Sequence, residues 1–534
     1  MLLSSSVVFA AASGISLFSA LASAQNVTAS LPVVDLGYEL YRAVGVNDTY
    51  GYYNFSNIRY AAAPLGDLRF KAPVAPATNR ATIQDGSLNR ICPQASTSSN
   101  STRDPRESED CLFLDVIVPQ KIFDNASQGN GSGAPVLVWI YGGGYTAGSK
   151  NYDPSGLIQR SSDGVIWVAM NYRLGAFGFL SGPTFQMNGT ANAGLYDQRF
   201  ALQWVQDNIH LFGGDKNRVT VFGESAGGGS IMHHITAYGG TAKAPFQQAI
   251  PQSPAWLPFS SLYGQEQTFQ SFLTAAGVSS LEEARQLTSE QLIAANYQQI
   301  ATSSAIYTYG PTIDGTYVTQ DPKSLLSHGQ FDKSVKIMVG HNTNEGVGML
   351  PTLSADAQLN ALISVALSTT PSAVLEYMTT TLYPSSSNST LYADPNTRAA
   401  LFAGEAIIDC NAFALSAGFG NDTYAYLFGV SPGLHGFDVA HTYYDPATGH
   451  RNTDGGEALD AYPLNATVAH VLQDYILSFA TAGVPSSALD GLADGFGKYG
   501  ADAQVVEMSE SGIEVVVDPA ANSRCAWWGL NLLS

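Results

Sequence analysis

Short apolar runs alternate with longer amphipathic segments through most of the chain. Each run is rich in Val, Ile or aromatic residues and is short enough for a buried strand. Such strands are predicted at 136–140, 165–170, 219–222, 335–340 and 424–430, with a hairpin at 505–508 and 513–517. A helix is predicted at 195–209. Strands and helices in alternation indicate an α/β protein with a central, mostly parallel sheet and helices on both faces.

Three further regions carry helical patterns. Residues 260–330 and 350–410 are rich in Leu, Ala, Gln and Ser, and we expect them to be helical insertions that cover a site at the carboxyl ends of the strands. An apolar stripe over 468–479, followed by Gly483, predicts a structural helix. Neither a linker nor a repeat interrupts the pattern, so residues 25–534 are expected to form one domain.

The first 24 residues resemble a secretory signal peptide. Residues 7–24 are apolar or small and end in Ala22-Ser23-Ala24, a small-x-small cleavage pattern before Gln25. The segment has no Lys or Arg in its first residues, which departs from the usual pattern. A membrane anchor fits less well, because Ser and Gly interrupt the run and no basic flank follows. We expect a secreted protein, with no later segment apolar enough to span a bilayer.

Charge and composition exclude some classes of binding partner. Only 13% of residues are charged, the formal net charge is −20 and the pI is near 4.7, which argues against nucleic acid and anionic membranes as partners. The sequence gives no indication of the oligomeric state. Ten Asn-x-Ser/Thr sequons suit a glycosylated secreted protein. They begin at Asn26, Asn47, Asn54, Asn100, Asn125, Asn130, Asn188, Asn388, Asn421 and Asn465.

The four cysteines are Cys92, Cys111, Cys410 and Cys525. An even count in an oxidising compartment favours two disulfides, for which three pairings are possible. The local pairing of Cys92 with Cys111, together with Cys410 with Cys525, is the one we favour. No cysteine spacing resembles a zinc motif, so neither a metal site nor a cofactor is predicted.

A nucleophile motif follows the strand at 219–222. Gly223-Glu224-Ser225-Ala226-Gly227 fits Gly-x-Ser-x-Gly, which holds a serine on a tight turn between a strand and a helix. A second match surrounds Ser431, but there Pro432 follows the serine. Proline has no N–H to help stabilise an oxyanion, so Ser431 is rejected on chemical grounds and Ser225 is retained.

A serine nucleophile needs oxyanion donors, a base and an orienting acid. Gly142-Gly143-Gly144 follows a strand and can bring backbone N–H groups close to a substrate oxygen. His435 lies in a glycine-containing loop just past a strand and is the predicted base, with His441 and His450 as alternatives. Glu345, in the loop after the strand 335–340, is the predicted acid. Asp314 is its rival, although Asp before Gly is usually a turn residue.

Several stretches together resemble the type-B carboxylesterase/lipase family, which includes cholinesterases and fungal secreted esterases and lipases. They are 108–112, 139–144, 171–173, 223–227, 345–346, 435–436 and 525–528. The resemblance implies an α/β-hydrolase fold and a triad of Ser225, Glu345 and His435. It also implies an oxyanion hole formed by the N–H groups of Gly143, Gly144 and Ala226. It supports the favoured disulfide pairings, and it implies two buried structural ion pairs, Arg173 with Asp197 and Arg69 with Glu109.

The resemblance implies a small-molecule ester as substrate. The loop between Cys92 and Cys111 encloses 18 residues, almost all polar and none aromatic. It therefore lacks both the tryptophan that binds choline in cholinesterases and an apolar lipase lid. We expect a carboxylesterase acting on soluble esters. A triacylglycerol lipase, a transesterase using the same acyl-enzyme and, least favoured, a non-catalytic adhesion protein stay as alternatives. Tyr145, Trp256 and Phe437 are candidate pocket walls.

Overall fold

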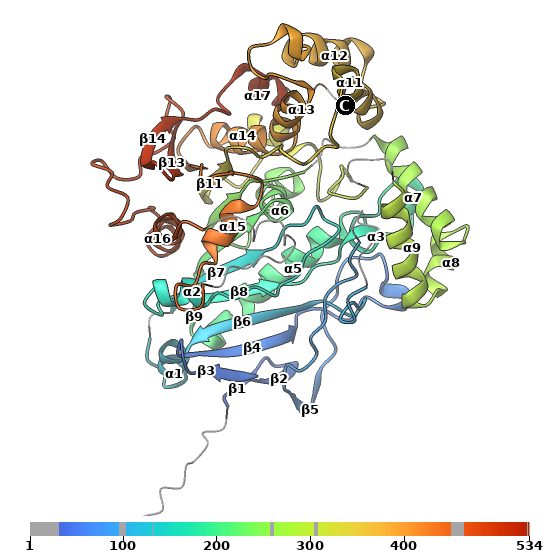
Figure 1. The fold of residues 1–534 in the computed structure, drawn as a ribbon. Helices are drawn as coiled ribbons and strands as arrows, with labels where there is room; N and C mark the ends of the chain where they lie inside the picture. Colours follow the sequence, from blue (N-terminus) through green and yellow to red (C-terminus); the bar gives the residue numbers. More distant parts are fainter. Residues whose placement is uncertain are drawn as a thin grey trace, which may run out of the picture.

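An eleven-stranded mixed sheet runs through the molecule (Figure 1). The structure is a computed structural model that describes residues 31–95, 103–131, 133–256, 261–303, 308–449, 464–530 and 532. Within this part the strand order is β14-β13-β12-β11-β10-β9-β7-β8-β6-β4-β3. The seven strands from β13 to β8 are parallel, and antiparallel strands complete both edges.

The parallel strands are the apolar runs of the sequence. The residues of β8 and β12 are all buried, as are those of β7 after Ala134 and the last six of β9, because a parallel sheet is covered on both faces. The strands are β3 (Gly45–Asn47), β4 (Tyr52–Arg59), β6 (Phe113–Pro119), β7 (Ala134–Ile140), β8 (Ile166–Met170), β9 (Gly214–Glu224), β10 (Gln248–Gln252), β11 (Lys336–Asn342), β12 (Tyr424–Phe428), β13 (Gln504–Ser509) and β14 (Gly512–Val517). A separate small sheet contains β1 (Val33–Asp35), β2 (Glu39–Arg42) and β5 (Asn79–Gln84).

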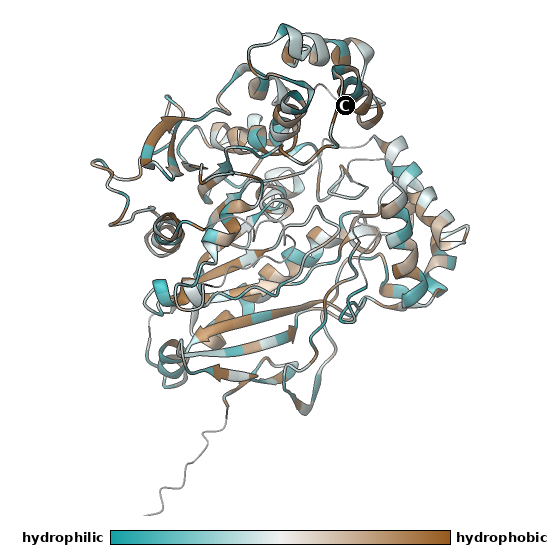
Figure 2. Cartoon of the chain, in the orientation of Figure 1, coloured by the Kyte–Doolittle hydropathy of each residue, from teal (hydrophilic) through white to brown (hydrophobic). Residues whose placement is uncertain are grey.

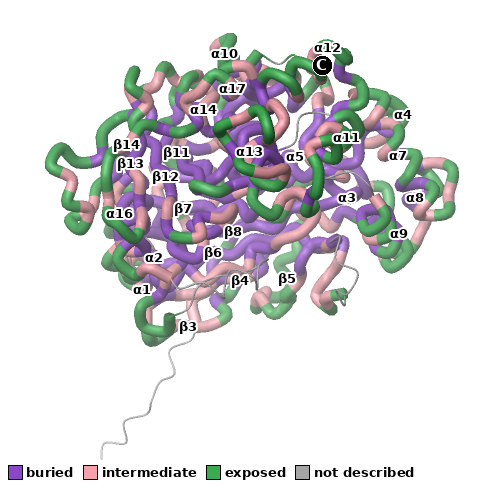
Figure 3. Tube along the Cα trace, turned by 45° about the horizontal axis from the view of Figure 1, so that its top comes forward, coloured by how far each residue is buried: buried purple, intermediate pink, exposed green. Residues whose placement is uncertain are grey.

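Helices cover the large sheet on both faces. The helices α5 (Ala193–Asn208) and α6 (Ala226–Ile235) pack on one another and on β9. On the other face, α2 (Ser155–Arg160) and α15 (Phe437–Thr442) pack against α16 (Ala466–Ala482), which contacts β7 and β9. Gly483 ends α16 in the left-handed conformation, as predicted. Figure 3 shows the sheet as a buried layer beneath more exposed helices, and Figure 2 shows the apolar character of its strands.

The two predicted helical regions are helical and surround one end of the molecule. The first contributes α7 (Leu262–Ala276), α8 (Leu281–Gln286), α9 (Ser289–Thr302) and α10 (Pro322–Ser327). The second contributes α11 (Asp356–Ala366), α12 (Ser372–Tyr377), α13 (Pro395–Gly404) and α14 (Cys410–Gly418), beside α17 (Ser523–Trp528). The remaining short helices are α1 (Gln120–Ser127), α3 (Gly175–Phe179) and α4 (Pro183–Gln186). In Figure 1, α7 to α9 and α11 to α13 form two separate groups.

The structure contains the predicted disulfides and the predicted buried ion pairs. Cys92 is bonded to Cys111 and Cys410 to Cys525. Arg173 pairs with Asp197 through Nε at 2.7 Å, and Arg69 pairs with Glu109 through Nη2 at 2.7 Å. All four charged side chains are at most 8% exposed, so each charge is compensated inside the protein.

One described helical stretch, Pro395–Gly418, is long and apolar enough to cross a bilayer, contrary to the expectation from the sequence. However, 72% of its most apolar window is buried inside the protein. It also contains Arg398, which is buried and paired with Asp356, and Glu405, which is paired with Arg524. These contacts belong to a helix in the protein interior.

Among the predicted sequons, those with exposed asparagines are Asn125, Asn130, Asn188 and Asn388, whereas Asn47, Asn54, Asn421 and Asn465 are half-buried. Asn465 caps α16 by accepting hydrogen bonds from two backbone N–H groups. The signal peptide, Asn26, Asn100 and His450 lie outside the described residues.

Candidate active site

Ser225 stands on a strained turn at the carboxyl end of β9. Its φ of 58° and ψ of −123° place it in a conformation that L-residues rarely adopt. The neighbouring glycines make this turn possible, because a Cβ on Gly223 or Gly227 would lie 2.4 or 2.0 Å from the carbonyl oxygen of Ile140. The Ser225 N–H donates to the Gln252 carbonyl at 3.0 Å, which ties the turn to β10. The motif thus forms the predicted strand–turn–helix.

His435 and Glu345 lie beside this serine. His435 Nε2 is 2.8 Å from Ser225 Oγ, and His435 Nδ1 is 2.6 Å from Glu345 Oε2. The other oxygen of Glu345 accepts hydrogen bonds from the Asn342 N–H and the Ser253 hydroxyl, each at 2.6 Å. The carboxylate is fully buried and the imidazole is 22% exposed. A continuous hydrogen-bonded path therefore runs from the buried carboxylate of Glu345 to the hydroxyl of Ser225.

The sheet brings these groups together from distant parts of the chain. Glu345 follows β11 and His435 follows β12, and these strands are parallel neighbours. Their loops are joined by Asn344, whose N–H donates to the Gly433 carbonyl at 2.8 Å, and by Asn342, whose side chain donates to the Leu434 carbonyl at 2.8 Å. Because parallel strands end at the same edge, residues 90 positions apart can meet here.

The predicted oxyanion donors lie close to Ser225. Gly143 and Gly144 have φ values of 103° and 61°, which favour glycine. A Cβ on Gly142 would lie 2.8 Å from that of Ser225, so this loop approaches the serine closely. Within the described chain, the N–H groups of Gly143, Gly144 and Ala226 donate to no backbone carbonyl. Such N–H groups near a nucleophile can receive an oxyanion.

Buried carboxylates surround His435. Besides Glu345, Glu224 places Oε1 3.3 Å from Nε2, and Asp438 lies close enough to act on the imidazole. Burial disfavours the imidazolium, but the charges of Glu224, Glu345 and Asp438 outweigh it and raise the pKa of His435 to about 9. Burial also raises the pKa of Glu224, and the charges of Asp438 and Glu345 add to that effect. The site therefore retains a proton more strongly than an isolated histidine does.

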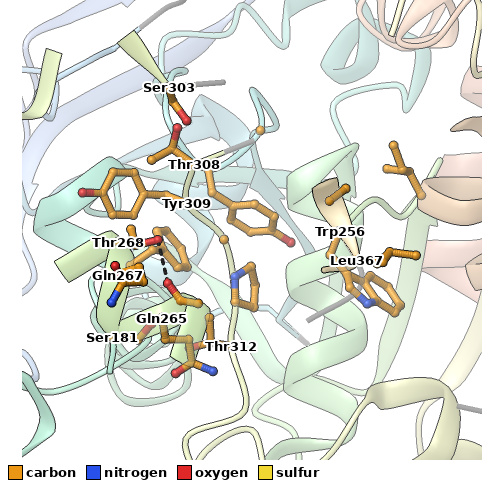
Figure 4. A pocket seen from close by; sticks show the side chains of 18 of the residues that line it. Ser181, Trp256, Gln265, Gln267, Thr268, Ser303, Thr308, Tyr309, Thr312 and Leu367 are labelled. Atoms are coloured by element: carbon orange, nitrogen blue, oxygen red, sulfur yellow. Dashed lines mark hydrogen bonds between the residues drawn. The ribbon is translucent and has the colours of Figure 1, made fainter. Parts of the chain in front are cut away.

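A cavity of about 440 Å³ opens beside Ser225 (Figure 4). Tyr145 and Trp256 line it, as predicted, together with His435. Phe437 does not, and the prediction that it forms a pocket wall is wrong. It opens α15 and points into the core, with its ring against those of Phe428 and His441, and it is 1% exposed.

The described part of the loop between Cys92 and Cys111 also lies outside the cavity lining. The walls come instead from α7, from α9, from the segment around Tyr309 and from residues near Leu367. The described residues of that loop therefore do not contribute to the surface that a substrate meets in this cavity.

The rival site residues have other contacts. Asp314 accepts hydrogen bonds from the Asn192 side chain and from the N–H groups of Thr316 and Val318, which makes it a turn residue. The two ring nitrogens of His441 contact the Phe437 carbonyl and the Asn465 N–H.

Sequence reasoning missed Ser253 and Asn342, which hold Glu345, and Asp438, which accepts from Tyr426 and Gln252. Ser253 directly follows β10, so its place at the carboxyl end of a strand was the available signal.

The order of the sheet and the strand–turn–helix at Ser225 define an α/β-hydrolase. Residues 42–514 match the carboxylesterase family. The chain is similar to the carboxylesterase patB of Penicillium expansum, with 39% identity over 94% of this chain and 96% of that protein. It is also similar to a secreted lipase of Arthroderma benhamiae, with 29% identity over 87% of this chain and 84% of that protein.

Solved structures agree with these relatives. The crystal structure of Aspergillus niger EstA matches with a TM-score of 0.81 and 28% identity, over 95% of this chain and 99% of that one. A thermophilic pNB esterase matches with a TM-score of 0.77 and 26% identity. The chain belongs to the carboxylesterase family and is a carboxylic ester hydrolase.

Proposed function

We propose that this protein is a secreted serine esterase that acts through a Ser225–His435–Glu345 triad and an acyl-enzyme. The observation that supports it best is the path of two hydrogen bonds, 2.8 and 2.6 Å long, that joins Ser225 Oγ to the buried carboxylate of Glu345 through both nitrogens of His435. This arrangement is the one that activates a serine hydroxyl in ester hydrolysis.

The mechanism follows from the roles of these atoms. Ser225 Oγ attacks the ester carbonyl while His435 Nε2 takes its proton, and the N–H groups of Gly143, Gly144 and Ala226 stabilise the oxyanion. His435 then protonates the leaving alcohol, and the C–O bond breaks to give the acyl-enzyme. Water repeats the sequence and releases the acid. Glu345 holds the imidazole tautomer and stabilises the imidazolium throughout.

Three observations support secretion. The N-terminal 24 residues have the pattern of a signal peptide. The chain forms two disulfides, which persist in oxidising compartments. A relative of similar length is named a secreted lipase. We propose a soluble ester as substrate because the cavity lining is a mixture of polar and apolar side chains rather than a hydrocarbon surface.

A chain-length series tests the proposal. The wild-type protein and a Ser225→Ala variant are assayed on p-nitrophenyl esters from acetate to palmitate. We expect hydrolysis of the shorter esters by the wild type and a loss of kcat by about 10⁴-fold or more in the variant, because the nucleophile is removed. Ser431→Ala is the matched control, since Ser431 stands in the other Gly-x-Ser-x-Gly match, and it should retain full activity.

Three results would count against parts of this account. Full activity in Ser225→Ala would refute the nucleophile. Hydrolysis confined to long-chain esters at an oil–water interface would indicate a lipase. Wild-type turnover that occurs only when an alcohol acceptor is supplied would indicate a transesterase.

A further inference from the structure

One side of the cavity beside Ser225 is built from buried polar side chains. Ser181, Gln265, Gln299, Tyr309 and Thr312 line it, and each is at most 8% exposed. In Figure 4 the labelled side chains of Ser181, Gln265, Tyr309 and Thr312 lie on one side of the pocket, with Trp256 and Leu367 on the other. Polar side chains this deeply buried are usually hydrogen-bonded, so their concentration on one wall makes that wall suited to a ligand with a polar group.

Thr312 is held in place by its backbone. The Asn192 side chain accepts from the Thr312 N–H and donates to the Thr312 carbonyl, both at 2.8 Å. Thr312 Oγ1 is buried and has no hydrogen-bond partner among the described residues. A buried hydroxyl without a partner is unfavourable, and a ligand oxygen or hydroxyl that reached it would remove this cost.

The neighbouring part of the wall is fixed by contacts between three segments. The Tyr309 hydroxyl donates to Gln299 Oε1, and Gln299 Nε2 donates to the Thr268 carbonyl at 2.8 Å. These bonds join the segment around Tyr309 to α9 and α7. The polar wall is therefore organised before any ligand binds, which favours recognition of a specific group.

The opposite wall carries several large apolar side chains. Trp256, Leu367 and Ile407 are buried there and contribute hydrocarbon and aromatic surface. No Lys, Arg, Asp or Glu is among the described residues that line the cavity. A charged substrate group would therefore enter without a counter-charge in the lining, which is costly, whereas a neutral oxygen function would not.

We propose that the preferred substrates are esters that carry a neutral hydroxyl, ether or carbonyl oxygen on one side of the ester bond and an apolar group on the other. The oxygen would bond to the polar wall at Thr312 and Gln265, and the apolar group would lie against Trp256 and Leu367. This inference rests on the proposed esterase function and specifies its substrate class.

Substrate pairs that differ only by an ether oxygen in place of a methylene test the inference. Butyl acetate with 2-methoxyethyl acetate places the oxygen in the alcohol, and ethyl pentanoate with ethyl 3-methoxypropanoate places it in the acid. The kcat/KM ratio within each pair is measured by proton release for the wild type, Thr312→Val and Gln265→Leu. Comparing ratios between proteins cancels the intrinsic reactivity of the esters.

We expect the oxygen-for-methylene ratio of at least one pair to fall about three- to tenfold in Thr312→Val and in Gln265→Leu, the effect of losing one hydrogen bond. Gln270→Leu and Thr274→Val are matched controls, because both residues are exposed on α7 outside the cavity lining, and their ratios should equal the wild type. Thermal unfolding verifies that each variant folds. Because Thr312→Val and Gln265→Leu change different residues, each one tests the inference separately.

Unchanged ratios in both folded test variants would overturn the inference. A wild-type preference for acetylcholine over its neutral isostere 3,3-dimethylbutyl acetate would also overturn it, because the lining carries no counter-charge. If the wild type hydrolyses none of these esters, nor p-nitrophenyl butyrate, the proposed function itself fails and this inference fails with it. Hydrolysis of p-nitrophenyl butyrate with unchanged ratios would refute the inference alone.

Discussion

At the scale of single residues, the feature that most affects the chemistry is the number of carboxylates around one imidazole. His435 contacts Glu345 through Nδ1 at 2.6 Å and Glu224 through Nε2 at 3.3 Å. In the proposed mechanism, His435 must be neutral to accept the serine proton. Because its pKa is raised to about 9, we expect activity to fall as the pH decreases through a range above that of an ordinary histidine.

Replacement of Glu224 tests this interpretation. In Glu224→Gln one negative charge near Nε2 is lost, so the imidazolium is less stabilised and the pKa of His435 falls. We predict that the acidic limb of the kcat/KM–pH profile shifts to lower pH by about one unit or more. Glu282→Gln, on the exposed side of α8, is the control and should leave the profile unchanged. Coincident profiles for Glu224→Gln and the wild type would contradict the assignment.

At the scale of secondary-structure elements, the end of β11 connects the site to the C-terminal segment. His341 is buried on β11, with Nε2 3.1 Å from Asp518 after β14 and Nδ1 3.5 Å from Asp409 before α14. The Tyr499 hydroxyl donates to the second oxygen of Asp518 at 2.9 Å. Burial opposes protonation of His341, but Asp518 and Asp409 outweigh it and raise its pKa to about 10.

This cluster predicts a pH-dependent contribution to stability. Because the folded-state pKa of His341 lies above its ordinary value of about 6.5, its contribution is fully present below pH 6.5 and is lost as the pH rises through about 10. We predict that the wild type unfolds at a higher temperature than His341→Gln at pH 6, and that this difference shrinks by pH 10. Scanning calorimetry over this range measures it, with the exposed His210→Gln as control. A difference that stays constant or grows with pH would refute the prediction.

The same elements show which features could be predicted from the sequence. The strands and the turn at Ser225 follow from local sequence patterns. The loops after β11 and β12 are adjacent because parallel strands end at one edge of the sheet. The direction of the Phe437 side chain could not be predicted, because closeness to His435 in the sequence does not determine which way a ring points. The position of Phe437 at the start of α15 instead turns the ring toward Phe428.

The polar wall of the cavity could not be predicted for a different reason. Gln265 and Thr312 lie on insertions whose packing against one another is set by tertiary contacts such as the Asn192 side chain at Thr312. No local pattern distinguishes a glutamine that faces a cavity from one that faces solvent, as Gln270 on the same helix does.

At the scale of the whole molecule, the carboxyl edge of a parallel sheet carries Ser225, His435 and Glu345, the proposed catalytic residues, and two helical insertions contribute walls of the adjacent cavity. The disulfide between Cys410 and Cys525 ties α14 to α17 beside the second insertion. In the proposed function, the sheet therefore accounts for ester hydrolysis, which this chain shares with its family, whereas the insertions determine the choice of ester.

Covalent labelling tests the central claim, that Ser225 is the nucleophile, most directly. The protein is treated with a p-nitrophenyl alkylphosphonate, digested and mapped by mass spectrometry. In this reaction the serine oxygen bonds to phosphorus, p-nitrophenolate leaves and the hydroxyl proton is lost. We predict one adduct, on Ser225, with release of one p-nitrophenolate per protein and complete loss of esterase activity. An adduct on another residue, Ser431 included, or full inactivation with Ser225 unlabelled, would contradict the account.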